Sequence, residues 1–112
     1  MNWEINSLSL ECDIEDVETA EKVENALRKM SNIKVEETSS MVEAIKFQCN
    51  IIKQVFIDIF GNETTEEIFK DIKLNRRLYT DILYSFYDFI SEQKQAMVRR
   101  SNAISRYAPK KK

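Results

Sequence analysis

The side chains of this 112-residue chain that could do chemistry are three pairs of adjacent acidic residues and two cysteines. Paired carboxylates act in many proteins as general acids and bases or as metal ligands. Adjacent residues on a helix point about 100° apart, so the two carboxylates of such a pair do not converge on one atom. We therefore interpret the pairs as solvated helix faces and as negative charges at helix N-termini. They are Glu15–Asp16, Glu36–Glu37 and Glu66–Glu67.

Histidine is absent from the sequence, and this removes several classes of catalyst. Cys49 would need a neighbouring base to act as a nucleophile, and the sequence has no imidazole for that role. A di-metal site in a helical bundle would need Glu-x-x-His motifs. A single glycine, Gly61, does not supply a glycine-rich phosphate loop. The sequence predicts a protein that is not an enzyme, that uses no metal or cofactor, and that acts by binding partners.

Size and composition indicate one globular domain that works in a cytoplasm. Hydrophobic residues make up 43% of the chain and charged residues 32%, which is typical of a folded domain. Cys12 and Cys49 each lie in an apolar pattern, which favours two buried thiols in a reducing compartment. The sequence has no apolar run of about 20 residues that would span a membrane, and its N-terminus lacks the basic region of a signal peptide.

Residues 2–12 alternate between apolar and polar side chains around the polar pair Asn6–Ser7. This period of two with a two-residue turn predicts a β-hairpin. A lone hairpin is marginally stable in water. We therefore expect its apolar face to pack on a helix or to pair with another chain. That face consists of Trp3, Ile5, Leu8 and Leu10.

The first helix is predicted to run from about Ile14 to Met30, with Asp13 as its N-cap. Its apolar residues recur in steps of three and four, which indicates one buried stripe. The polar segment Asn32–Thr38 follows as a connector. The stripe consists of Val17, Ala20, Val23, Leu27 and Met30.

The second helix carries the widest apolar surface, and we expect it to be the central, most buried helix. Ser39 or Ser40 caps its start. Gly61 ends it by accepting a left-handed backbone conformation. Its stripe consists of Met41, Ile45, Cys49, Ile52, Phe56 and Ile59, supplemented by Phe47, Ile51 and Val55.

Two further helices complete the fold. Thr64 and Glu67 have the spacing of a capping box and predict a short helix. Asn75 then caps a last helix from about Arg76 to Arg106, whose length of about 45 Å exceeds what a small domain can cover. Its distal half is expected to project. The predicted fold is mainly α: an N-terminal β-hairpin packed on a small bundle of three main helices and one short helix.

The charges are distributed unevenly along the chain. Residues 93–112 carry seven basic side chains and no acidic one, whereas residues 1–92 carry all 19 acidic side chains and a net charge of −9. Such asymmetry favours a partner contact at the basic end. Alternatively, the basic residues only solubilise the helix end and complement its dipole. We divide the chain into a domain, residues 1–106, and a basic tail, residues 107–112.

Aromatic residues crowd the first half of the last helix, at Tyr79, Tyr84, Phe86, Tyr87 and Phe89. They point in too many directions for a single core face. One interpretation is an ordinary core with tyrosines at its rim. The other is an apolar patch that receives a helix of another protein or a second copy of the chain.

Several short segments resemble those of small phage and prophage proteins that are encoded in the tail-morphogenesis region of siphophage-like and myophage-like genomes. The segments are the turn Ile5-Asn6-Ser7-Leu8, an acidic helix start followed by Ala20-Glu21-Lys22, the helix end Phe56…Phe60-Gly61, and Tyr107-x-Pro109 followed by basic residues. That family is regarded as tail assembly chaperones. The resemblance implies a non-enzymatic role in the bacterial host cytoplasm, with the tape-measure protein and the tail-tube protein as partners.

Arguments from exposure, with nothing transferred from a family site, predict which residues contact the partner. They are Tyr79, Leu83, Tyr84, Tyr87, Arg99, Arg100 and Arg106. Two other functions stay open. One is a nucleic-acid-binding regulator that uses the basic C-terminal helix. The other is a permanent structural subunit of the tail, self-assembling through the hairpin edge as a homo-oligomer.

Overall fold

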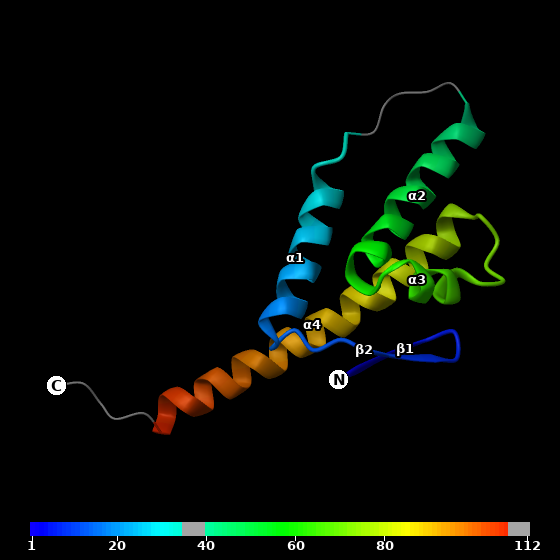
Figure 1. Cartoon of the computed structure of the whole chain (residues 1–112). Helices are drawn as coiled ribbons and strands as arrows, with labels where there is room; N and C mark the ends of the chain where they lie inside the picture. Colours follow the sequence, from blue (N-terminus) through cyan, green and yellow to red (C-terminus); the bar gives the residue numbers. More distant parts are fainter. Residues whose placement is uncertain (35–39, 108–112) are drawn as a thin grey trace.

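The computed structural model describes residues 1–34 and 40–107. In chain order its elements are β1 (Asn2–Ile5), β2 (Leu8–Glu11), α1 (Val17–Ser31), α2 (Met41–Phe60), α3 (Asn62–Phe69) and α4 (Arg76–Tyr107). The predicted fold class is therefore confirmed, with three main helices, one short helix and an N-terminal hairpin (Figure 1). The predicted connector beyond Lys34, the alternative cap Ser39 and the tail beyond Tyr107 lie outside the described residues.

The hairpin forms in the register that the alternation predicts. Trp3 pairs with Leu10 and Ile5 with Leu8, which puts these four side chains on one face. Asn6 and Ser7 both have positive φ, 47° and 67°, as a type I′ turn requires. The Asn6 side-chain nitrogen Nδ2 donates to the Ile68 backbone carbonyl at 2.9 Å, and this bond ties the turn to α3.

Helix α1 begins three residues later than predicted, and its N-cap is Asp16 rather than Asp13. The Asp16 carboxylate accepts a hydrogen bond from the Thr19 backbone N–H at 3.1 Å. Asp13 instead accepts from the N–H of Glu15 and forms a turn ahead of the helix. The backbone N–H of Ile14 is bonded to a side chain of α4. That long-range bond ties the segment before α1 to α4, and the Asp16 N–H bonds the Asp13 carbonyl at 3.1 Å to close the turn.

Helix α2 is the central helix, since it contacts α1, α3 and α4. Ser40 caps it as predicted, accepting from the Glu43 N–H. The expected apolar stripe is buried only from Cys49 onward. In the first two turns Met41, Ile45 and Phe47 are exposed, contrary to expectation. These turns lie at the end of α2 away from the hairpin, beyond the shared core (Figure 1).

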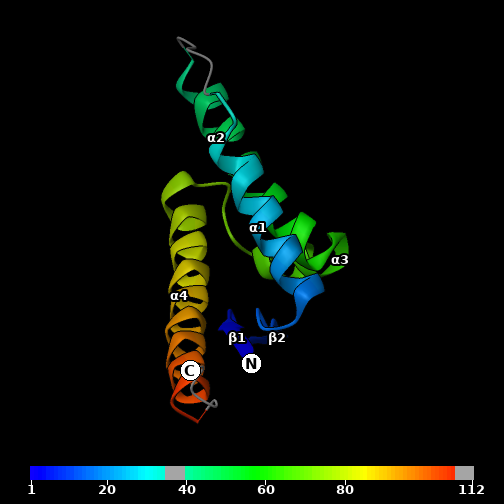
Figure 2. The same ribbon diagram turned by 90° about the vertical axis from the view of Figure 1, so that its left-hand side faces the viewer.

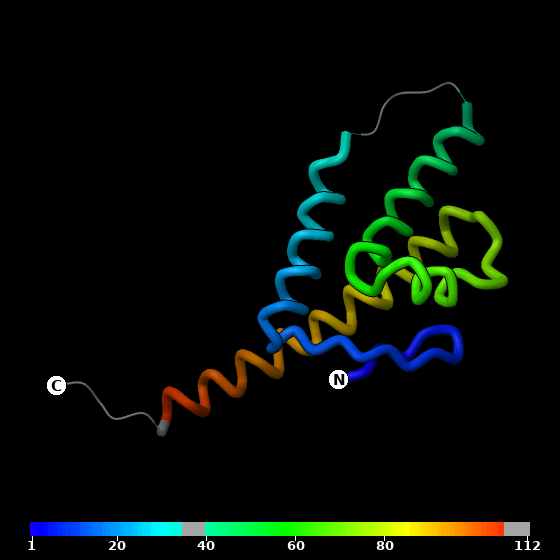
Figure 3. The backbone as a smooth tube through the Cα atoms, viewed as in Figure 1, coloured from blue at the N-terminus to red at the C-terminus, as the bar shows by residue number. Residues whose placement is uncertain are grey.

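Gly61 ends α2 and lets the next helix begin at once, so the chain turns sharply between α2 and α3 (Figure 3). Its φ of 87° is positive as expected, but its ψ of 170° puts it in a region reached essentially by glycine alone. Helix α3 therefore starts at Asn62, too early for the predicted Thr64–Glu67 capping box to form. No side chain caps it, and the buried Thr65 hydroxyl donates to the Gly61 carbonyl at 2.7 Å.

The core is built around the single tryptophan. The Trp3 ring stacks on Phe56 with centroids 5.5 Å apart and meets Phe86 edge-on at 5.1 Å. Its indole N–H donates to the Ser85 hydroxyl at 3.1 Å. Trp3 thereby fixes the hairpin to α2 and α4 together. The predicted burial of both cysteines is confirmed.

Helix α4 has the predicted cap and length. The Asn75 side-chain oxygen Oδ1 accepts from the Leu78 N–H at 3.1 Å, and the helix runs to Tyr107. Every described side chain from Lys94 to Arg106 is exposed except Ala96, which is half-buried. The C-terminal half of α4 extends past the other elements, as expected (Figures 1 and 2).

Candidate partner-binding surfaces on α4

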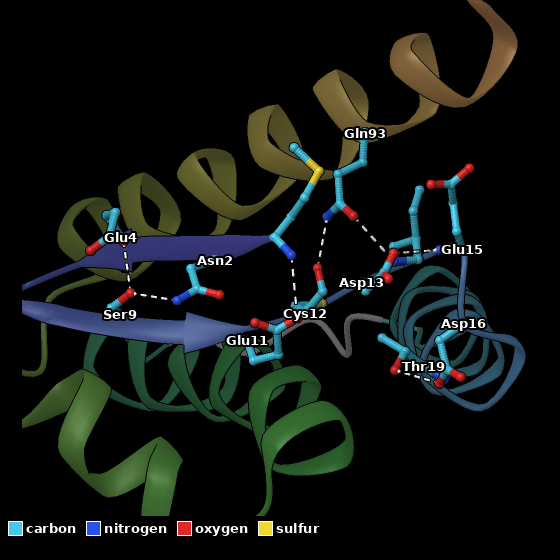
Figure 4. Close-up of polar contacts among 12 residues, drawn as sticks. Asn2, Glu4, Ser9, Glu11, Cys12, Asp13, Glu15, Asp16, Thr19 and Gln93 are labelled. Carbon is cyan, nitrogen blue, oxygen red and sulfur yellow. Dashed lines mark hydrogen bonds and ion pairs between the residues drawn. The ribbon is translucent and has the colours of Figure 1, made fainter. Parts of the chain in front are cut away.

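Gln93 marks the point at which α4 leaves the domain. Its side chain is only 1% exposed, although it is polar. The amide nitrogen donates to the Cys12 carbonyl at 2.9 Å, and the amide oxygen accepts from the Ile14 N–H at 3.1 Å (Figure 4). One side chain thus satisfies both main-chain groups between β2 and α1. This residue was not predicted from the sequence, although it continues the alternating three- and four-residue spacing of Leu83, Phe86 and Ile90.

Two of the predicted contact residues belong to the core. Tyr79 and Leu83 are both buried. The Tyr79 ring lies 4.4 Å from that of Phe69, so α3 covers it. The same burial raises the pKa of the Tyr79 phenol. In this fold neither side chain is open to a partner.

The other two ring residues lie on the outer flank of α4. Tyr84 is 59% exposed, Tyr87 is half-buried at the edge of the core, and their ring centroids are 6.5 Å apart. Burial raises the pKa of the Tyr87 phenol, and the neighbouring Tyr84 raises it to a smaller extent. Tyr87 therefore stays a neutral hydrogen-bond donor at pH 7. Val98 follows Tyr87 by about three helical turns, on the same flank, and is also exposed. We call Tyr84, Tyr87 and Val98 the tyrosine strip.

The three predicted arginines do not form one surface. The Arg100 guanidinium makes a bidentate ion pair with Glu15, with Nε 3.2 Å from Oε1, and joins distal α4 to the turn before α1. Arg99 and Arg106 are exposed and seven residues apart, so they share the side of α4 that faces away from the core. Arg100 is therefore largely neutralised, while the other two are free of ion pairs within the described residues.

A family match covers nearly the whole chain. The model of a family of unknown function, DUF6673, matches residues 6–112. The chain belongs to the DUF6673 family. No curated protein and no solved structure matches it.

Members of two of the three adjacent acidic pairs act as a helix cap or as ion-pair partners. Asp16 caps α1, Glu15 pairs with Arg100, and Glu66 lies 3.0 Å from the Lys53 ammonium. Glu36–Glu37 lies outside the described residues. Within residues 1–34 and 40–107, no three Cys, Asp or Glu side chains group closely enough to hold a metal ion. None of the helices in this part of the chain could cross a bilayer.

Proposed function

We propose that this DUF6673 protein is a non-enzymatic assembly chaperone or adaptor for phage tails, which binds a helical stretch of the tape-measure protein during tail morphogenesis. The tail-tube protein is the second proposed partner. The phage assignment rests on the sequence resemblance. The observation that carries the binding role is the tyrosine strip, because it leaves large rings on the outside of the longest helix.

The dimensions of the strip suit a helical partner. Tyr84 and Val98 are separated by about 21 Å along α4, at about 1.5 Å per residue. Apolar side chains spaced over that length match the anchors of an amphipathic helix lying along the surface. Tyrosine offers an apolar ring with a polar tip, so the strip can bind while its edge stays wet. Such a surface supports the moderate affinity that a chaperone needs in order to leave its client.

The exposed start of α2 supports the same proposal from a second place. Met41 and Val42 are largely exposed, and Ile45 and Phe47 are partly so. Apolar side chains gathered at the end of a helix mark interaction surfaces more often than isolated ones do. A long client helix has several such surfaces to contact on this protein.

Nucleic-acid binding through the basic helix is the main competing function. The pairing of Arg100 with Glu15 weakens the attraction of distal α4 for phosphates. In the described part of the chain it leaves Lys94, Arg99 and Arg106 as the cations of distal α4 without an ion pair. A protein that neutralises several phosphates loses affinity steeply as salt rises. Apolar contact with a client helix has little salt dependence.

Co-expression with fragments of the tape-measure protein tests the proposal. The expected result is a complex with a helical fragment that persists at high salt, and the absence of the protein from finished tails. Binding to duplex DNA with a steep salt dependence, without capture of any fragment, would support the regulator instead. Retention of the protein in purified tails would support a structural subunit.

A further inference from the structure

The core-facing seam of α4 continues past the domain. Its members alternate at three- and four-residue spacing and include Ile90, Gln93, Met97, Arg100 and Ile104. Ile90 and Gln93 are buried, but Met97 is 37% exposed and Ile104 is 70% exposed. Arg100 on this seam is paired with Glu15 of the same chain, so the apolar side chains left without a full cover beyond Gln93 in the described chain are Met97 and Ile104.

A hollow lies beside this seam, between α4 and the diverging α1. Its volume is about 120 Å³, and cavities of about 150 Å³ hold a benzene ring, so it has room for a branched aliphatic side chain. Its walls are apolar, and Glu24 and Lys94 stand at its rim. The apolar lining consists of Ile14, Ala20, Val23, Leu27, Ile90 and Met97.

The projecting side chain and the hollow are related by one spacing. Ile90, at the hollow, and Ile104, on the projecting end, each lie seven residues from Met97. If two α4 helices run antiparallel with Met97 opposite Met97, then Ile104 of each copy falls level with Ile90 of the other. We propose that a second copy of this chain covers the seam in this way, and that the two Ile104 side chains fill the two hollows.

The charges favour the antiparallel direction. Glu18, Glu21 and Glu24 of α1 are exposed and Glu24 lines the hollow, while the described residues 94–106 of α4 carry four basic side chains and no acidic one. In the antiparallel pair the basic end of each copy lies beside the acidic α1 of the other. A parallel pair would bring two basic ends together and leave both hollows empty. Each copy thus carries both halves of a complementary surface, which makes a second copy the fitting occupant.

Cysteine trapping tests the symmetry directly. The native Cys12 and Cys49 are buried, and burial raises the pKa of both thiols, so neither competes. Met97→Cys is expected to give a disulfide-linked dimer on mild oxidation with diamide, because the twofold axis of the proposed dimer passes between the two copies of residue 97. Arg99→Cys, on the opposite side of α4, is the control and should stay monomeric. Equal cross-linking of both variants, or of neither, would overturn the proposal.

Sedimentation of the untrapped protein gives an independent measure. The wild type should self-associate at micromolar concentration, and Ile104→Glu should weaken this by roughly a hundredfold or more, since it forces a carboxylate into an apolar hollow. Asn102→Glu introduces the same charge away from the seam and should leave the dimer intact. Ile104 is exposed in a single copy, so both variants should melt like the wild type at concentrations too low for self-association.

The dimer and the proposed client are distinguishable because they use different flanks of α4. A monomeric wild type whose capture of a tape-measure fragment is lost in Ile104→Glu would assign the seam to the client and overturn the dimer. A dimer that captures no fragment would support the present inference and contradict the chaperone role.

Discussion

The side chain of Gln93 and the backbone of Ile14, 79 residues apart in sequence, share a buried hydrogen bond of 3.1 Å. The same amide also bonds the Cys12 carbonyl, so it spans the junction between hairpin and α1. This contact holds the main chain at Ile14 against α4, ahead of the first turn of α1. It also decides where α4 leaves the core. The surfaces proposed for partners lie to either side of this point.

Gln93→Leu should destabilise the protein without changing its fold. The substitution leaves the Ile14 N–H and the Cys12 carbonyl buried and unpaired, at about 1–3 kcal/mol for each group. The free energy of unfolding in urea is expected to fall by about 2–5 kcal/mol. A change below about 0.5 kcal/mol would show that water replaces the amide at this junction.

Gln93→Glu should make stability depend on pH. When protonated, the introduced carboxyl can donate to the Cys12 carbonyl and accept from the Ile14 N–H, but its ionised form cannot donate and is buried. Burial raises the pKa of such a carboxyl above its unfolded value of about 4.3. The variant should therefore approach wild-type stability below that pH and lose stability as pH rises through the folded pKa. Urea titrations at acidic and neutral pH, compared with the wild type, measure the difference. Parallel curves for the two proteins would contradict the bonding scheme.

Ser85→Ala should weaken the anchor of the hairpin. The indole N–H of Trp3 would lose its partner in a part-buried site, at about 1–2 kcal/mol. Since Trp3 is the only tryptophan, its fluorescence follows the hairpin as the protein unfolds. The expected result is a lower urea midpoint with an unchanged native emission maximum. Ser91→Ala, on the exposed side of the same helix, is the matched control and should have no effect.

Removal of the two outer rings should separate client binding from folding. In the double variant Tyr84→Ala/Tyr87→Ala, Tyr84 loses few contacts, while truncation of the half-buried Tyr87 should cost about 1–2 kcal/mol. Capture of a tape-measure fragment is expected to fall at least about tenfold, as for the loss of an aromatic anchor. Tyr84→Phe/Tyr87→Phe keeps the rings and should retain capture. Full capture by the alanine variant would remove the tyrosine strip from the proposed function.

Local signals in the sequence account for much of this fold. The alternation in residues 2–12 and the caps Ser40 and Asn75 are predicted correctly because each depends on residues within a few positions. The predicted starts of α1 and α3 are wrong: Asp16 rather than Asp13 caps α1, and α3 begins directly after Gly61, which has an unusual backbone conformation. Asp13 and Asp16 are equally suitable cap residues by type, and a glycine signals a helix end without showing that another helix starts at the next residue.

The candidate site was harder to predict because α4 is apolar on several sides. Spacing alone does not say which side the neighbouring elements cover. Phe69 of α3 packs on Tyr79 and removes it from the surface, whereas Tyr84 stays outside. Likewise the pairing of Arg100 with Glu15 divides a basic segment that looks uniform in sequence. Both outcomes follow from tertiary packing.

The two native thiols should be unreactive until the protein unfolds. Burial, and to a smaller extent the negative charge of Glu11, raise the pKa of the Cys12 thiol to about 11. Burial raises the pKa of the Cys49 thiol as well. At pH 8 only about one Cys12 in a thousand would be thiolate, and burial also keeps the reagent out. Ellman's reagent is expected to label neither cysteine in the folded protein and both in urea. Because the Cys12 carbonyl is bonded to Gln93, the Gln93→Leu variant should expose Cys12 before Cys49, and mass spectrometry of the labelled peptides would reveal that order. Simultaneous labelling would mean that the hairpin junction and the α2 core open as one unit.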